Sequence, residues 1–191
     1  MLKSIWLREK GEALKEIIFI RHGKVDVNPN DKINSKDLEQ WVKAYDMAKL
    51  DVNSKPNEEV HTVVNNADFL LTSILPRTLE SASHFEKKID EKNALFNELP
   101  LPAIHIPYFE FKAKAWLIIL RLVLFFARSD KEYVAKALIP LLERSKEHDS
   151  LVLIGHGGLN YYMHKALLKD GWSLQGKASI DNWGMTRLLK P

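Results

Sequence analysis

The sequence contains no cysteine among its 191 residues, and this absence excludes several kinds of chemistry. The chain has no disulfide framework, no thiolate nucleophile and no metal site built on cysteine sulfur. A protein without disulfides is also typical of a reducing compartment, so we expect a cytoplasmic location.

An excess of charge of one sign is also missing. Lysine and arginine number 28 against 25 aspartates and glutamates, which leaves a formal net charge of +3 at pH 7. So small an excess does not indicate a nucleic-acid partner, whereas it is compatible with a small anionic substrate. With 46% hydrophobic and 28% charged residues, the composition is that of an ordinary globular protein, and the length suits one domain.

A hydrophobic run long enough to cross a bilayer is the third absence. Residues 115–127 are apolar except for Arg121, but as a helix they would span about 20 Å, whereas the hydrocarbon core is roughly 30 Å thick. We therefore expect an apolar helical insertion at about residues 112–128, either buried or forming a homodimer surface from Trp116 to Phe126. The alternative is a lid or a peripheral membrane contact, with basic residues around the helix near lipid headgroups.

The first 15 residues lack the uninterrupted apolar core of a secretory signal, because charged side chains are mixed among the apolar ones. We expect residues 1–15 to form a short leader packed on the domain, and residues 16–191 to form the domain itself. The expected location is therefore the cytoplasm. The apolar insertion leaves open the alternative that the protein attaches peripherally to a membrane.

Three apolar runs predict the buried strands of a parallel sheet, because each is continuous and ends in polar turn residues. They span residues 17–20, 67–72 and 150–154. Helical spacing of apolar residues lies between them, as in the helix expected at about residues 36–50, whose apolar face carries Trp41 and Tyr45. Residues 94–96 are expected to form a short strand. Because strands and helices alternate without an internal repeat, the sequence predicts a single α/β domain.

The residues that follow these runs can carry chemistry. They are R-H-G at 21–23, S-x-x-x-R at 73–77 and G-H-G at 155–157. Because the carboxyl ends of parallel strands lie at one sheet edge, where α/β folds bind ligands, we expect the three motifs to converge. The guanidinium forks of Arg21 and Arg77 suit phosphate oxygens, and the helix after Gly157 offers N–H groups to an anion. Together the motifs predict a phosphate pocket with two histidines, His22 and His156.

In this order, the motifs resemble those of the histidine phosphatase superfamily, which has the phosphoglycerate-mutase-like fold. The resemblance covers about residues 16–189 and includes Asn28 after R-H-G and Ala82 at the end of S-x-x-x-R-x-x-x-S-A. A looser resemblance to a bacterial branch of small phosphatases rests on E-L-P-L-P at 98–102, the apolar helix after it and Asn-Trp-Gly at 182–184. The implied architecture is one three-layer domain, with a mostly parallel sheet and helices on both faces.

The resemblance also implies roles for individual residues. His22 would be the nucleophile and form a phosphohistidine intermediate, which agrees with the nucleophilicity of a neutral imidazole near neutral pH. Water would then hydrolyse the intermediate, with no metal and no other cofactor in either step. The phosphoryl group would be bound by Arg21, Asn28, Arg77, His156 and the backbone N–H of Gly157.

The resemblance also implies an acidic proton donor for the leaving oxygen, between the second arginine and the histidine of G-H-G. Glu98 fits this position, and Glu110 is the second choice. A glutamate is ordinarily ionised at pH 7, so this role requires partial desolvation beside the phosphate. The alternative for Glu98 is a surface carboxylate in a turn.

Two positions depart from the family pattern. Val25 stands where threonine is common, so the resemblance implies one missing hydroxyl near the phosphate, a loss of roughly 1.5–3 kcal/mol for one hydrogen bond to a charged group. Ser81 also replaces a common threonine but keeps the hydroxyl.

The sequence thus predicts a phosphomonoesterase that acts on a small phosphorylated substrate. The alternative is a non-catalytic protein of the same fold that binds a phospho-ligand or serves as a scaffold. A mutase is less favoured, because the chain has no long insertions to close over a retained phosphoglycerate. A metal-dependent hydrolase ranks third, because no carboxylate cluster accompanies His22 and His156.

Overall fold

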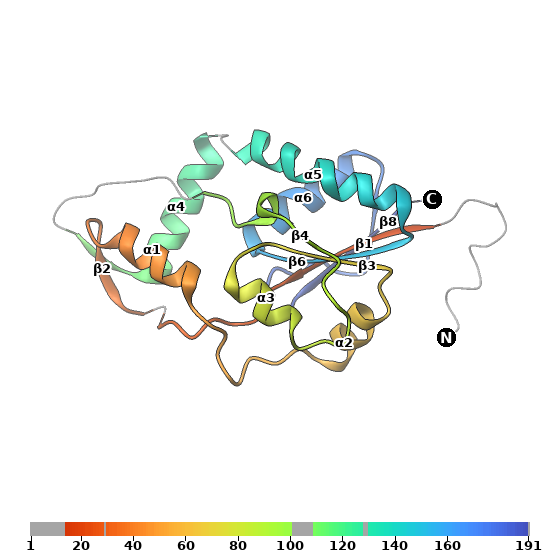
Figure 1. The fold of residues 1–191 in the computed structure, drawn as a ribbon. Helices are drawn as coiled ribbons and strands as arrows, with labels where there is room; N and C mark the ends of the chain where they lie inside the picture. Colours follow the sequence, from red (N-terminus) through yellow and green to blue (C-terminus); the bar gives the residue numbers. More distant parts are fainter. Residues whose placement is uncertain (1–13, 29, 101–108, 128–129, 191) are drawn as a thin grey trace.

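The computed structural model describes residues 14–28, 30–100, 109–127 and 130–190, and Figure 1 shows their arrangement. Most of the expected leader therefore lies outside the described residues, and Lys15 already belongs to the first strand.

Six strands form the central sheet, in the order β4-β3-β6-β1-β8-β7. Their bounds, in that order, are Glu91–Lys92, Phe69–Thr72, Ser150–Gly155, Lys15–Arg21, Met185–Lys190 and Ser173–Gln175. The first four are parallel to one another, whereas β8 is antiparallel to both of its neighbours. The sheet is mixed but mostly parallel, so the predicted fold class is confirmed.

Helices cover both faces of this sheet (Figure 1). They are α2 (Glu58–Asn65) and α3 (Pro76–Ala82) on one face, and α5 (Asp130–Glu147) and α6 (Gly157–Lys169) on the other. The side chains of β1 alternate between the two cores: Ile17 and Phe19 pack with α5 and α6, whereas Ile18 and Ile20 pack with α2 and α3. The continuous apolar run of β1 is explained by this burial on both faces.

A smaller layer lies beside the sheet (Figure 1). It consists of α1 (Leu38–Met47), α4 (Ala113–Ala127) and a two-stranded antiparallel sheet of β2 (Lys32–Asn34) and β5 (Glu110–Lys112). Trp116 is fully buried in its core and donates a hydrogen bond from its indole N–H to the carbonyl of Ile33 at 2.7 Å. This separate core explains how a segment so apolar folds outside the main sheet.

The apolar helix α4 is thus buried on one face and open on another. Trp116 and Leu120 pack inside the small core, whereas Ile118 and Val123 are exposed. Trp116 cannot take part in a dimer or membrane surface, and the side chains of residues 121, 122 and 124–126 in the expected surface lie outside the described ones. Across the described residues, no helix has both the length and the apolar character needed to cross a membrane.

One expected strand is wrong. Residues 94–96 form a short 3₁₀ helix, Ala94–Phe96, and the neighbouring strand is β4, two residues earlier. The side chain of Asn93 accepts a hydrogen bond from the backbone N–H of Leu95 at 3.0 Å, and this cap favours a helical turn over an extended chain. The turn leads directly to Glu98.

Candidate active site

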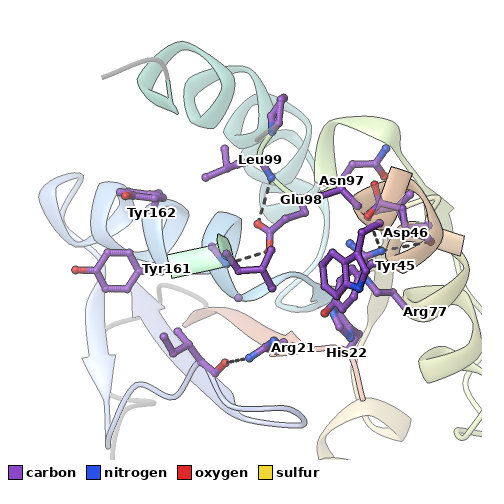
Figure 2. A pocket seen from close by; sticks show the side chains of 18 residues that line it. Arg21, His22, Tyr45, Asp46, Arg77, Asn97, Glu98, Leu99, Tyr161 and Tyr162 are labelled. Atoms are coloured by element: carbon purple, nitrogen blue, oxygen red, sulfur yellow. Dashed lines mark hydrogen bonds and ion pairs between the residues drawn. The ribbon is translucent and has the colours of Figure 1, made fainter. Parts of the chain in front are cut away.

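The three motifs meet at one edge of the sheet, as the parallel strands predicted. Arg21, at the end of β1, lies in register with Gly155, at the end of β6, and β3 ends beside them at Thr72. The backbone N–H of His22 also donates to the carbonyl of Gly155 at 3.0 Å. A cavity of about 380 Å³ opens at this edge, and residues of all three strand ends or of the helices after them line it (Figure 2).

The imidazole of His22 lies at the bottom of the cavity with only 2% of the residue exposed. Its Nδ1 lies 2.7 Å from the carbonyl oxygen of Gly23, so in the neutral ring Nδ1 carries the proton and Nε2 carries the lone pair. Burial, and then the charges of Arg77 and Arg21, lower the pKa of His22 to about 3, although the Gly23 carbonyl opposes the shift. His22 is therefore neutral near pH 7, the state that a nucleophile requires.

His156 lies directly behind His22 and does not itself line the cavity. The two rings have centroids 5.2 Å apart and meet at 63°. Nε2 of His156 lies 2.9 Å from the hydroxyl of Ser73, whereas its Nδ1 is buried without a hydrogen-bond partner among the described residues. Burial, with the charges of Arg77 and Arg21 and the neighbouring His22, lowers the pKa of His156 well below its usual range. Both imidazoles are therefore neutral.

Two guanidinium groups complete the bottom of the cavity. Arg77, on α3, is 1% exposed and donates from Nη1 to the carboxylate of Asp46 at 2.9 Å, and its guanidinium lies 5.2 Å from the ring centroid of Tyr45. Arg21 donates to the carbonyl of Ile180 at 2.9 Å. In both arginines, Nε is buried and has no partner in the described part of the chain. Buried donors without acceptors are what a phosphoryl group would satisfy.

Glu98 lines the same cavity, and its carboxylate is held by backbone N–H groups (Figure 2). It accepts hydrogen bonds from Leu99 at 3.2 Å, Gly158 at 3.5 Å and Leu159 at 3.1 Å. The last two amides belong to the first turn of α6, so Glu98 satisfies N–H groups that the sequence predicted for the anion. A Cβ at Gly158 would lie 2.7 Å from the Glu98 carboxylate, which explains the glycine.

The other carboxylate considered for the acid lies elsewhere. Glu110 is on β5, its side chain is exposed, and it does not line the cavity. Glu98 is half-buried at the cavity, which does not fit the alternative of an ordinary surface turn residue.

Asn28 does not lie where the resemblance placed it. Its side chain is exposed and is not among the cavity residues. Its amide donates to the carboxylate of Asp31 at 2.7 Å, and its oxygen accepts from the backbone N–H of Asn30 at 3.1 Å. Local turn hydrogen bonds, which asparagine forms readily, therefore hold this side chain away from the site.

The two departures from the family pattern have different consequences. Val25 is buried outside the cavity and forms an isolated antiparallel bridge with Leu50, so its methyl groups contribute to packing beside the site. The hydroxyl of Ser81 accepts a hydrogen bond from the backbone N–H of Gly23 at 3.0 Å and donates to the carbonyl of Arg77 at 2.6 Å. Ser81 thereby connects R-H-G to α3.

A C-terminal loop braces the R-H-G segment. The side-chain amide of Asn182 donates to the carbonyl of His22 at 2.9 Å, and the backbone N–H of Trp183 donates to the carbonyl of Arg21 at 3.1 Å. The indole of Trp183 covers Gly23, where a Cβ would approach it to 2.7 Å. The Asn-Trp-Gly motif at 182–184 marked these supporting residues in the sequence, but nothing in the sequence indicated that they contact the R-H-G segment.

Above the charged residues, the cavity is lined mainly by apolar and aromatic side chains. We call Arg21, His22 and Arg77 the cavity floor, and the apolar residues the cavity wall. The wall consists of Trp41, Val42, Tyr45, Leu75, Leu99, Pro100, Leu117, Tyr161, Tyr162 and Ile180. They come from α1, α4, α6 and the loops between elements; Leu75 lies within the motif at 73–77 and Leu99 and Pro100 within the one at 98–102, whereas the other wall residues lie outside the motifs.

No protein-family model and no curated protein matches the sequence. Solved structures do match. A phosphoserine phosphatase from Entamoeba histolytica in complex with 3-phosphoglyceric acid is similar with a TM-score of 0.58 and 20% identity, over 91% of this chain and 89% of that one. A mutant of that enzyme in complex with phosphoserine has a TM-score of 0.56 and 19% identity, over the same shares of the two chains. A mycobacterial hydrolase has a TM-score of 0.51 and 14% identity, over 92% of this chain and 91% of that one.

At these identities, the similarity shows a shared fold. The chain has the mixed, mostly parallel α/β fold of these phosphatase structures, in agreement with the predicted fold class. The structural neighbours include phosphatases, among them the E. histolytica enzyme.

Proposed function

We propose that the protein is a phosphomonoesterase that hydrolyses a phosphate ester through a phosphohistidine intermediate on His22. The observation that supports this most strongly is the cavity floor: a buried neutral imidazole between two arginines whose Nε groups have no partner in the described chain. Such a site offers a nucleophile and the positive charge that a transferring phosphoryl group needs.

In the first step, the lone pair on Nε2 of His22 attacks phosphorus, and the bond between phosphorus and the ester oxygen breaks. The carbonyl of Gly23 holds the proton on Nδ1 and stabilises the positive charge that develops on the ring. Arg21 and Arg77 offset the charge on the phosphoryl oxygens, which is the main source of catalysis in phosphoryl transfer. Glu98, protonated for this step, gives its proton to the leaving oxygen.

In the second step, water attacks phosphorus and the bond to Nε2 breaks. The Glu98 carboxylate left by the first step takes one proton from this water, so orthophosphate, neutral His22 and the acid form of Glu98 are regenerated. His156 lies behind the nucleophile, with its ring against that of His22, and its Nδ1 has no hydrogen-bond partner among the described residues. Neither step of this proposal uses a metal.

A set of phosphate monoesters tests this proposal with the wild type, His22→Gln and His61→Gln. The glutamine keeps position 22 neutral but cannot form a phosphoenzyme, so we expect kcat/KM to fall by roughly 10⁴-fold or more. His61, on α2 outside the cavity, is the matched control and should retain activity. An acid-labile phosphoenzyme trapped with the wild type and absent from His22→Gln would identify the intermediate.

Equal turnover by the wild type and His22→Gln would overturn the mechanism. Binding of phosphate esters without turnover of any would favour the non-catalytic alternative. Addition of a chelator tests the third possibility, because a metal-dependent hydrolase would lose activity and the proposed enzyme would not.

A further inference from the structure

The cavity wall carries aromatic pairs on two different helices. Trp41 and Tyr45 of α1 stack with ring centroids 5.4 Å apart at 25°, and Tyr161 and Tyr162 of α6 meet edge to face at 5.3 Å. In Figure 2, Tyr45 lies beside Arg77, while Tyr161 and Tyr162 lie on the other side of Glu98. A group that extends from the floor toward solvent therefore passes between aromatic surfaces.

The charges of the cavity are distributed unevenly. Among the described lining residues, the cations are Arg21 and Arg77, and both belong to the floor, where the phosphoryl group needs them. The other two ionisable residues there are Asp46, whose carboxylate is paired with Arg77, and Glu98, which carries the proton for the leaving oxygen in the proposed first step. A second anionic group on a substrate would therefore find no further cation in the described lining and would be repelled by the Asp46 carboxylate.

Leu117 of α4 extends this apolar character to the far helix of the small layer. The cavity of about 380 Å³ is within the usual range for small-molecule sites, so it holds a leaving group as well as the phosphoryl group. An apolar group placed there would leave water and contact aromatic rings, which favours binding.

We propose that the leaving group of the substrate is uncharged and largely apolar, an aromatic ring or a hydrocarbon chain that lies against the cavity wall. This inference rests on the proposed function and specifies the substrate class of the same site. It separates this chain from enzymes whose substrates carry a carboxylate beside the phosphate.

Pairs of esters that differ in one property test the inference. Phenyl phosphate and 4-(carboxymethyl)phenyl phosphate share an aryl leaving group and differ by one carboxylate, whereas hexyl phosphate and glycerol 1-phosphate differ in apolar surface. We expect kcat/KM to favour the first member of each pair by about tenfold or more. Phosphatidic acid in phosphatidylcholine vesicles forms a further arm: its hydrolysis would identify a lipid as the source of the apolar group, and turnover of soluble esters alone a free metabolite.

Variants of the wall connect this preference to the named residues. Tyr161 is 40% exposed, so Tyr161→Ala should fold normally and raise KM for phenyl and hexyl phosphate by about tenfold, with little change for glycerol 1-phosphate. Trp41→Ala provides a second wall variant on the opposite helix. Phe109→Ala removes an equally large exposed ring outside the cavity and should leave both ester series unchanged.

Equal or better turnover of the charged and polar members would overturn the inference while leaving the phosphatase proposal intact. The same holds if Tyr161→Ala and Trp41→Ala lower the turnover of all esters by one common factor. Absence of turnover for every ester, including those of the wider set, would instead remove the proposed function and the inference with it.

Discussion

The floor and the wall of the cavity differ in burial, origin and chemistry. The floor residues His22 and Arg77 are 2% and 1% exposed and follow strand ends, whereas the wall residues come largely from helices, and Tyr161 is 40% exposed. Electrostatic interactions are strongest where water is excluded, so phosphoryl chemistry belongs at the buried floor. The half-exposed wall can change its side chains without disturbing the sheet, so it is suited to selecting the leaving group.

The buried charge of the floor is stabilised by residues of the helix that forms part of the wall. A buried guanidinium is unfavourable unless it is paired, and Arg77 is paired with Asp46 and lies over Tyr45, both residues of α1. The helix that supplies part of the wall therefore also supports the floor. Substitutions in the floor should therefore lower the turnover of all esters alike, whereas substitutions in the wall should change the preference among leaving groups. Residues of α1, which contact both regions, are the exception.

After the loss expected for His22→Gln, the largest effect is expected for Arg77→Lys. Lysine keeps the charge but loses the planar fork, so kcat/KM should fall by roughly 10²- to 10³-fold, and by the same factor for apolar and polar esters. Steady-state kinetics on both ester series measure this, with Arg187→Lys as the control, since Arg187 pairs with Glu16 away from the cavity. A loss confined to one ester series would show that Arg77 acts on the leaving group, and the division into floor and wall would be wrong.

The floor was largely predictable from the sequence, and the wall was not. His22 and Arg77 follow apolar strands, and parallel strands bring their carboxyl ends together whatever the details of packing. Trp41 and Tyr45 were predicted on an apolar helix face, but the sequence cannot state which neighbour that face meets. Tertiary packing decides this, and it placed them on the cavity instead of wholly in a core.

Predictions at single side chains failed where local hydrogen bonds decide the conformation. Asn28 forms a turn with Asp31, and Asn93 caps a 3₁₀ helix in place of the expected strand. The partner of Arg77 carried no signal, because Asp46 is one of several acidic residues on polar positions of a helix. Spacing along the chain does not distinguish it from those that face solvent.

Acid should destabilise the protein through the neutral histidines at and behind the floor. The pKa of His22 is about 3 in the folded protein and about 6.5 in an unfolded chain, so between these values the unfolded chain binds a proton that the folded one does not. Stability is therefore lost as the pH falls below about 6.5. His22 alone should contribute a loss of about 2 kcal/mol between pH 7 and pH 5, and the lowered pKa of His156 adds in the same direction.

Urea denaturation of the wild type and His22→Gln at several pH values measures this contribution. The variant cannot titrate at position 22, so its free energy of unfolding should fall less steeply with acid. Two parallel curves would mean that His22 has the same pKa in the folded and the unfolded protein, and burial at the floor would then not be what keeps the imidazole neutral. No wall variant should change this slope.

The smallest effect is expected at the residue that joins the two regions. Asp46 lies on α1 with the wall, yet its carboxylate binds Nη1 of Arg77, and 41% of that side chain is exposed. A phosphoryl dianion must share Arg77 with this carboxylate and is repelled by it, so Asp46→Asn should bind inorganic phosphate about three- to tenfold more tightly. Titration calorimetry measures the affinity, and Asp170→Asn, which removes a surface ion pair with Lys190, is the control that should change nothing. Weaker phosphate binding by Asp46→Asn would mean that the carboxylate is needed to orient the guanidinium, and α1 would then belong to the floor as much as to the wall.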